Sequence, residues 1–196
     1  MEYLLALDRK AFLWINNEWS TPPLDFFCSY FITWLGNAGV VIALVIIFFA
    51  VKKPAYLRQH LPWFVAAMLV AGLCVFALKK MIARPRPLSD LAPLIEGGKV
   101  YVHVLGQELW YRSFPSGDTQ TAFTAATYFS CLFPRWVLFF LCLATAVGLS
   151  RIYMGAHFPL DVVAGGLIGA AIAFGTWGVR QKAYDLPFFH KRKGGR

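Results

Sequence analysis

The sequence predicts an all-α, polytopic bundle of membrane-spanning helices, and three observations carry this prediction. Hydrophobic residues make up 58% of the 196 residues and charged residues only 15%, whereas about a quarter of a soluble domain is charged. The apolar residues gather in long runs, and a run of roughly 20 apolar residues crosses a bilayer. The charged residues cluster between these runs. We therefore expect one integral-membrane domain over residues 1–196.

Five apolar runs are expected to cross the membrane. Residues 26–51 form the longest run, and residues 61–78 are just long enough to span. Residues 118–133 and 136–149 are short and separated by a tight Pro-Arg turn, so we expect them to form an antiparallel helical pair. The fifth run, residues 158–178, is rich in glycine and alanine, and small residues allow membrane helices to approach closely.

Both ends of the chain are expected to lie outside these spans. Residues 1–25 predict an interfacial N-terminal helix, because residues 3–19 mix polar, aliphatic and aromatic side chains as amphipathic surface helices do. A sixth short or tilted span in this region is the alternative. Residues 179–196 carry several lysines and arginines and are expected to form a basic cytoplasmic tail.

The net charge of +9 does not indicate nucleic-acid binding in a chain of this kind, and we expect no nucleic-acid partner. The 19 lysines and arginines divide almost evenly between the two membrane faces, so the positive-inside rule does not fix the orientation. The cysteines all fall in apolar stretches without metal-binding spacing, and we expect buried, inert thiols: Cys28, Cys74, Cys131 and Cys142.

Three polar segments are expected to converge on one membrane face, because each lies where a predicted span begins or ends. They are residues 79–87, 112–118 and 150–161. The second segment, RSFPSGD, opens a predicted membrane helix with a hydroxyl, a glycine and a carboxylate. Polar groups at such a position indicate a site rather than a simple helix end.

The first candidate function of this cluster is anion binding. Lys79, Arg86 and Arg151 supply positive charge, and arginine can bind two phosphate oxygens at once. Ser116 is placed to cap the helix or to donate to an oxyanion, and Gly117 lets an anion approach the backbone at the helix N-terminus. The remaining exposed bases, Arg84, Lys80 and Lys99, are expected to reach lipid headgroups instead.

The second candidate function is nucleophilic catalysis. His157 and Asp161 are four residues apart and share a face if helical. The carboxylate can then hold one ring N–H and fix the tautomer, which leaves the other nitrogen free as a nucleophile. Pro159 between them fits only the first turn of a helix, so both residues are expected at the mouth of the fifth span.

These residues resemble the type-2 phosphatidic acid phosphatase family, which shares a fold with bacterial acid phosphatases and vanadium haloperoxidases. The family motifs are K-x6-R-P, P-S-G-H and S-R-x5-H-x3-D. The matching positions run from residue 79 to residue 161: Lys79, Arg86, Pro87, Pro115, Ser116, Gly117, Ser150, Arg151, His157 and Asp161.

The resemblance implies an enzyme that hydrolyses lipid phosphates through a phosphohistidine on His157, oriented by Asp161. It implies phosphate binding by the five cluster residues already named, with no metal or other cofactor and no protein partner. Membrane lipids and a lipid phosphate substrate are the implied partners. Bacterial membrane members act at the outer face of the inner membrane, which implies a multi-pass protein with its active site toward the periplasm or the outside.

One position departs from the family pattern. The second motif ends in histidine, the acid that protonates the leaving group, and here the residue is Asp118. Three accounts are open. Asp118 is a working acid, or the leaving group needs little help because it is itself a phosphate, or aspartate is a substitution that weakens turnover.

The motifs do not specify the substrate. Lipid A at its glycosidic phosphate and undecaprenyl pyrophosphate are the first candidates, and phosphatidylglycerophosphate and phosphatidic acid stay open. Two other functions are compatible with the same pocket: a haloperoxidase-like oxidoreductase, and a lipid-phosphate binder or transporter without catalysis.

Overall fold

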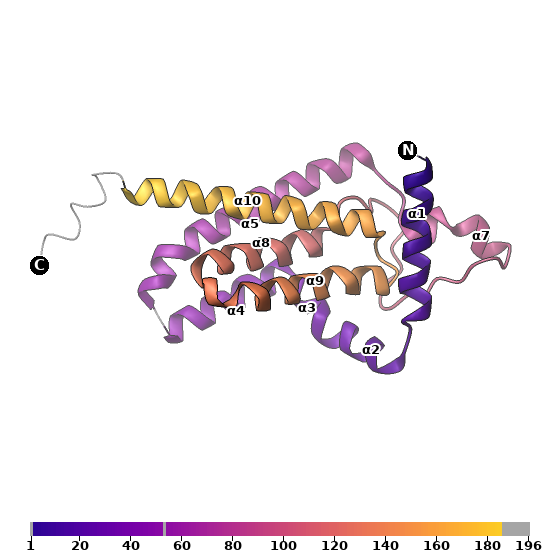
Figure 1. Cartoon of the computed structure of the whole chain (residues 1–196), viewed down its shortest axis with the longest axis horizontal. Helices are drawn as coiled ribbons and strands as arrows, with labels where there is room; N and C mark the ends of the chain where they lie inside the picture. Colours follow the sequence, from indigo (N-terminus) through magenta and orange to yellow (C-terminus); the bar gives the residue numbers. More distant parts are fainter. Residues whose placement is uncertain (1, 53, 186–196) are drawn as a thin grey trace, which may run out of the picture.

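The structure, a computed structural model, describes residues 2–52 and 54–185, and these residues form helices and no strand. In chain order the elements are α1 (Glu2–Leu13), η1 (Trp14–Glu18), α2 (Pro22–Phe27), η2 (Cys28–Ile32), α3 (Thr33–Leu35), α4 (Ala38–Lys52), α5 (Pro54–Ile82), α6 (Pro87–Asp90), α7 (Ala92–Glu96), α8 (Gly117–Leu132), η3 (Pro134–Trp136), α9 (Val137–Tyr153) and α10 (Pro159–Asp185). The long helices lie along one axis, and α1 crosses them at one end (Figure 1).

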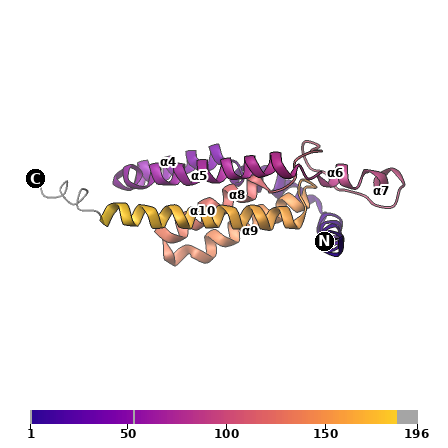
Figure 2. The ribbon, with the colours of Figure 1, turned by 90° about the horizontal axis from the view of Figure 1, so that it is seen from above.

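Helix α8 is the centre of the bundle and packs against α4, α5, α9 and α10 (Figure 2). The glycines of α10 make its contact with α8 possible. A Cβ atom at Gly165 would overlap the carbonyl oxygen of Ser116, and one at Gly169 would overlap that of Gln120. The predicted close packing of this small-residue helix is therefore confirmed, and it fixes the start of α8 against α10.

The predicted span over residues 26–51 is bent and does not form one straight helix. The chain bends by 69° between the segment Pro22–Leu35 and α4. Asn37 begins the new helix, because its Oδ1 accepts from the backbone N–H of Val40 at 3.1 Å. Gly36, at the bend, lies against the start of α8, because a Cβ atom there would lie 2.7 Å from the Cβ of Asp118.

The described residues contain three helices long and apolar enough to cross a membrane, or four if the bent pair counts as one span. The predicted spans 61–78, 136–149 and 158–178 lie within α5, α9 with its preceding turn, and α10. Helix α8 has 16 residues, fewer than the roughly 20 that a straight span requires. The expected total of five spans therefore stays a prediction.

The N-terminal helix exists but is shorter than the predicted 1–25 segment. Helix α1 and the π-helical turn η1 end at Glu18, and the next helix begins at Pro22. Its buried face carries Asp8 and Asn16 as well as Phe12, so this face packs on protein. The Asn16 amide donates to the carbonyl oxygens of His103 and Tyr153 at 2.8 and 2.7 Å, which anchors the helix across the bundle end.

Two further expectations are only partly met. Of the predicted tail, residues 179–185 belong to α10, and residues 186–196 lie outside the described part of the chain. Of the cysteines expected to be buried, Cys28 is buried but Cys142 is exposed on α9. An apolar thiol on the outer surface of a membrane helix faces lipid rather than a protein core, which the apolar sequence around it could not distinguish.

Candidate active site

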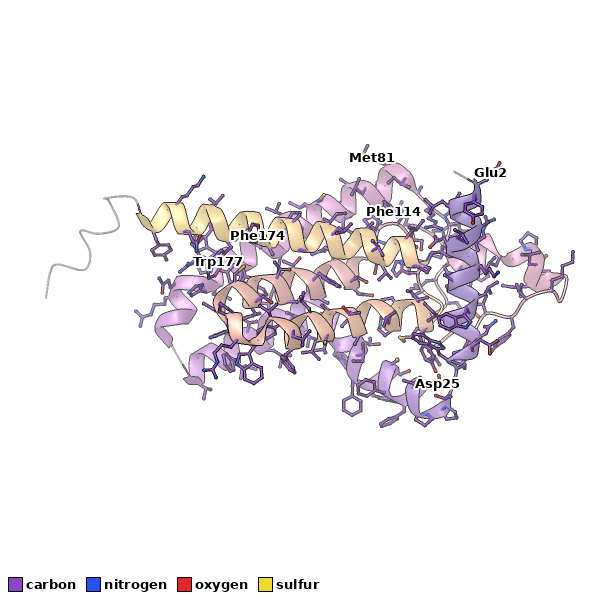
Figure 3. The ribbon with its side chains drawn as sticks, viewed as in Figure 1. Glu2, Asp25, Met81, Phe114, Phe174 and Trp177 are labelled. Carbon is purple, nitrogen blue, oxygen red and sulfur yellow. The ribbon has the colours of Figure 1, made fainter. Side chains whose placement is uncertain are left out.

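The three polar segments meet at the end of the bundle that α1 crosses. Phe114, in the second segment, lies toward the end that α1 crosses, whereas Trp177 lies toward the opposite end (Figure 3). Lys79 lies in the last turn of α5, Arg151 in the last turn of α9, and Asp161 in the first turn of α10. The predicted convergence is therefore confirmed.

His157 and Asp161 are joined through a residue that the sequence did not single out. Their closest atoms, Nδ1 and Oδ2, are 3.7 Å apart, which is too long for a hydrogen bond. Ser113 lies between them: its Oγ donates to Asp161 Oδ2 at 2.5 Å and lies 3.3 Å from His157 Nδ1. All three side chains are buried. The predicted direct hydrogen bond between His157 and Asp161 is thus replaced by a relay of two contacts through the hydroxyl of Ser113.

This relay determines the tautomer of His157. The hydroxyl of Ser113 has one proton, which it donates to Asp161, so its oxygen can only accept from the imidazole. His157 therefore carries its proton on Nδ1 and has a free lone pair on Nε2. Burial lowers the pKa of His157 to about 4, with the charges of Arg86 and Lys79 acting in the same direction. The imidazole is neutral at pH 7, as a nucleophile must be.

Asp161 is held from its other side by Arg84. Arg84 donates from Nη1 to Asp161 Oδ1 at 2.7 Å and from Nη2 to Asp8 Oδ2 at 2.6 Å. Asp8 also accepts from the backbone N–H of Leu160 at 2.9 Å. Both carboxylates are buried. The expectation that Arg84 reaches lipid headgroups is therefore wrong, because two buried carboxylates hold its guanidinium inside the protein.

Lys79 and Arg86 both donate hydrogen bonds to the loop that precedes α8. Lys79 Nζ donates to the carbonyl oxygens of Arg112 and Ser113 at 2.7 and 3.4 Å. Arg86 donates from Nε to the Tyr111 carbonyl at 2.9 Å and from Nη1 to the Ala156 carbonyl at 3.1 Å. Carbonyl groups do not neutralise these cations. The two positive charges therefore remain available to an anion.

The start of α8 has the predicted cap. Ser116 is the N-cap residue and accepts from the backbone N–H and the hydroxyl of Thr119 at 3.4 and 2.9 Å. Gly117 is the first helical residue, and outside its own helix and chain neighbours the nearest atom to a Cβ built there would be Cγ1 of Val75, at 4.0 Å. The space beside Gly117 is therefore not filled by other side chains, and a helix N-terminus favours anions.

Arg151 and Asp118 form the last part of the cluster. Arg151 Nη1 lies 3.2 Å from Asp118 Oδ2, and Nη2 donates to Thr33 Oγ1 at 2.8 Å. Arg151 is only 7% exposed, so it does not extend to the headgroups as a surface arginine would. Arg86 interacts electrostatically with Asp118, Asp161 and Arg151, which places these candidate site residues in one cluster.

The arrangement can carry out phosphoryl transfer. A neutral, oriented imidazole provides a nucleophile. Cations and a helix N-terminus stabilise the charge that builds on the phosphoryl oxygens. A carboxylate beside them can exchange a proton with a leaving group.

Sequence reasoning missed Ser113, Arg84, Asp8 and Thr33. Ser113 and Arg84 lie inside quoted motif segments, so their position was a usable signal. Asp8 is a lone acid on the apolar face of an amphipathic helix, which is a weaker signal of the same kind. Thr33 lies in a largely apolar run, and nothing in that run indicated a role in the site.

Comparison with known proteins agrees with this geometry. The profile of the PAP2 superfamily matches residues 60–185. A lipid A 4'-phosphatase of Bacteroides thetaiotaomicron is 31% identical over 183 residues, which cover 90% of this chain and 77% of that protein. An undecaprenyl-diphosphatase of Sulfolobus acidocaldarius is 32% identical over 49% of this chain and 43% of its own length.

A solved structure is similar over most of its length. The crystal structure of LpxE from Aquifex aeolicus superposes with a TM-score of 0.71 at 34% sequence identity, covering 86% of this chain and 93% of the other. The family profile covers more than half of the sequence, including every residue of the three motifs. The chain belongs to the PAP2 superfamily.

Proposed function

We propose that this membrane protein hydrolyses a lipid phosphate through a covalent phosphohistidine at His157. The observation that carries the proposal is the Ser113 relay, which leaves Nε2 of a buried, neutral His157 free. The cluster around it supplies the positive charge that a phosphate requires. The names of the similar proteins, lipid A 4'-phosphatase and undecaprenyl-diphosphatase, support a lipid as the bearer of that phosphate.

The reaction has two steps. In the first, Nε2 of His157 attacks phosphorus, the bond from phosphorus to the lipid oxygen breaks, and the lipid leaves. The positive charge of the phosphorylated imidazole is balanced through Ser113 by Asp161. Lys79, Arg86 and Arg151 stabilise the equatorial oxygens. In the second step a water molecule gives a proton to the Asp118 carboxylate and attacks phosphorus. The bond from phosphorus to Nε2 breaks, inorganic phosphate leaves and the imidazole is neutral again.

Asp118 is the proposed acid for the leaving oxygen. It stands beside Arg151 at the start of α8, where the family has histidine. A carboxylate bound to Arg151 also competes with phosphate for that arginine, so phosphate binding releases the Asp118 side chain from Arg151 toward the leaving oxygen. The Arg151–Asp118 pair therefore couples substrate binding to the position of the acid.

Asp118→Asn is expected to impair hydrolysis of lipid phosphomonoesters more than hydrolysis of lipid pyrophosphates. An alkoxide from a phosphomonoester leaves poorly and needs a proton, whereas a phosphate leaving from a pyrophosphate is already a stable anion. General acid catalysis contributes about 10²–10⁴ in rate. Asp118→Asn should therefore lower kcat/KM by that order for a lipid monoester and much less for a pyrophosphate of matched chain. Equal losses on both substrates would exclude Asp118 as the leaving-group acid.

A second substitution at position 118 introduces the histidine of the family motif. Asp118→His is expected to keep monoester hydrolysis near the wild-type level and to move its pH optimum upward, because an unperturbed imidazole titrates roughly 2.6 units above an aspartate. The measurement is kcat/KM against pH for wild type and variant. A large gain for the histidine form would instead identify the aspartate as a weakening substitution.

The Asp8–Arg84–Asp161 chain is proposed to position the nucleophile. Asp8→Asn keeps the size of the side chain but weakens its hold on Arg84, and through it on Asp161 and His157. A misplacement of about 1 Å costs on the order of 10² in rate. We expect a fall of that order in kcat, with KM nearly unchanged, because none of these groups touches the phosphate.

The control is a second ion pair between α1 and the same loop region. Arg9 and Asp90 are joined at 2.7 Å, and Arg9 is exposed, so this pair contributes little to stability. Asp90→Asn should leave kcat unchanged. An equal loss of kcat in Asp8→Asn and Asp90→Asn would mean that Asp8 only attaches α1 to the bundle.

The proposed substrates are lipid A, at its glycosidic phosphate, and undecaprenyl pyrophosphate, with phosphatidylglycerophosphate and phosphatidic acid as the alternatives. The proposed location is the bacterial inner membrane, with α1 in the interface on the outer side and residues 179–196 in the cytoplasm. Described residues at the two ends of the chain lie at opposite ends of the bundle (Figure 1), which supports termini on opposite sides.

The proposal is tested by measuring phosphate release from a panel of purified lipid phosphates in detergent. Turnover of at least one lipid monoester or pyrophosphate is the expected result. Tight binding of these lipids without phosphate release would instead favour a lipid-phosphate binder or transporter.

A further inference from the structure

We propose that an apolar groove beside the cluster holds one hydrocarbon chain of the substrate while its phosphate lies at Arg151. The groove lies between α4, α8 and α9, with a volume of about 630 Å³, and the described residues that line it carry no charge. This inference rests on the proposed function, because it gives a place to the chain of the same lipid. The groove would therefore be a site that selects the hydrocarbon chain, next to the site that binds the phosphate.

The groove begins one helical turn from the phosphate-binding residues. Ala122 lines it on α8 and Val147 lines it on α9. Residues four apart share a helix face, so Asp118 continues the face of Ala122 and Arg151 continues the face of Val147. These two side chains meet across the head of the groove at 3.2 Å. A lipid phosphate bound by Arg151 therefore has its chain directed along the groove.

The lining changes from small to aromatic along the groove. Near the head it consists of alanines of α8 and α9, such as Ala125 and Ala144, which leave space between the helices. At the far end it consists of rings, including Phe129, Phe133 and Phe140. Small residues followed by bulky ones make a groove that is wider near its head and narrower among the rings.

The length and position of the groove suit a membrane lipid. From Ala122 to Leu132, where α8 ends, the helix rises about 15 Å, and the next residue, Phe133, lines the far end of the groove. One leaflet is half of a hydrocarbon core of about 30 Å, so the groove is as deep as one leaflet. Leu44 and Phe139 on its rim are exposed, so a chain can enter sideways from the bilayer. The volume lies within the range of roughly 300–1,000 Å³ that holds a single small ligand, which indicates one chain.

The groove is expected to act by orientation rather than by affinity. A chain that moves from the bilayer into the groove exchanges one apolar environment for another, so it gains little from the hydrophobic effect. Its fixed direction instead holds the phosphorus near His157. Filling the groove should therefore affect long-chain substrates and spare short-chain ones.

The experiment compares two lipid phosphates with the same headgroup, one long-chained and one short-chained, in the same detergent. Ala125→Trp places an indole in the groove. Ala171→Trp is the matched control, because Ala171 is exposed on α10 and does not line the groove. The ratio of kcat/KM for the long-chain to that for the short-chain lipid should fall at least about tenfold in Ala125→Trp and stay unchanged in Ala171→Trp.

A second variant fills the groove from the facing helix. Leu143→Trp, on α9, should lower the same ratio, and turnover of the short-chain lipid shows that each variant is folded with an intact site. An unchanged ratio in both groove variants would overturn the inference, and so would loss of both substrates in both groove variants. Absence of turnover in the wild type would contradict the proposed function itself and the inference with it.

Discussion

His157→Ala is expected to abolish lipid phosphate hydrolysis, with a loss on the order of 10⁴ to 10⁶ in kcat, as when a catalytic nucleophile is removed from a hydrolase. The loss is large because the relay from Asp161 through Ser113 has no function without the imidazole. The helices should be unaffected, since His157 precedes α10 and caps no helix. The measurement is phosphate release by purified protein of confirmed helix content.

The matched control is His60, which is buried near the start of α5, at the end opposite the site. His60→Gln removes a buried imidazole without touching the cluster, and the folded variant should keep its activity. Substantial turnover by a folded His157→Ala protein would show that another group attacks phosphorus.

Arg151→Ala is expected to lower kcat/KM by about 10²–10³, the effect of removing one preorganised donor from a developing oxyanion. Arg151→Lys should restore little of this. The guanidinium of Arg151 reaches Asp118 and Thr33 with two different nitrogens, and an ammonium group cannot keep such a planar fork. The lysine variant therefore retains the charge and loses the geometry.

Arg135 supplies the control, because it is exposed in η3 at the opposite end of α9. Arg135→Ala and Arg135→Lys should both keep full activity. Near-wild-type activity in Arg151→Lys would mean that charge alone is sufficient at this position.

The sequence predicted the helical membrane fold and the convergence of the polar segments, because both follow from local patterns. Long apolar runs form membrane helices, and charged residues at the ends of these helices must lie at a membrane face. It did not place the bend at Gly36, although Gly36 and Asn37 interrupt the apolar run there, and it could not reveal that Gly36 lies against Asp118. That contact joins residues far apart in the chain, which no periodicity reports.

The motif residues were predicted, but the way they are held together was not. The spacing of His157 and Asp161 suggested a direct hydrogen bond, whereas the structure places Ser113 between them. The sequence suggested that Arg84 is a surface base, whereas in the structure Asp8 of α1 binds its guanidinium as a second partner. Both corrections come from tertiary packing, since each joins segments that lie 48 or more residues apart.

The central claim is that phosphate is transferred to His157, and locating the phosphoryl group on the protein tests it most directly. The wild-type enzyme is mixed with a lipid phosphate, quenched in alkali during turnover and analysed by peptide mass spectrometry. The account predicts a phosphoryl group on the peptide that contains His157, and none in His157→Ala. A phosphoryl group on a different residue of the active wild-type enzyme would contradict it.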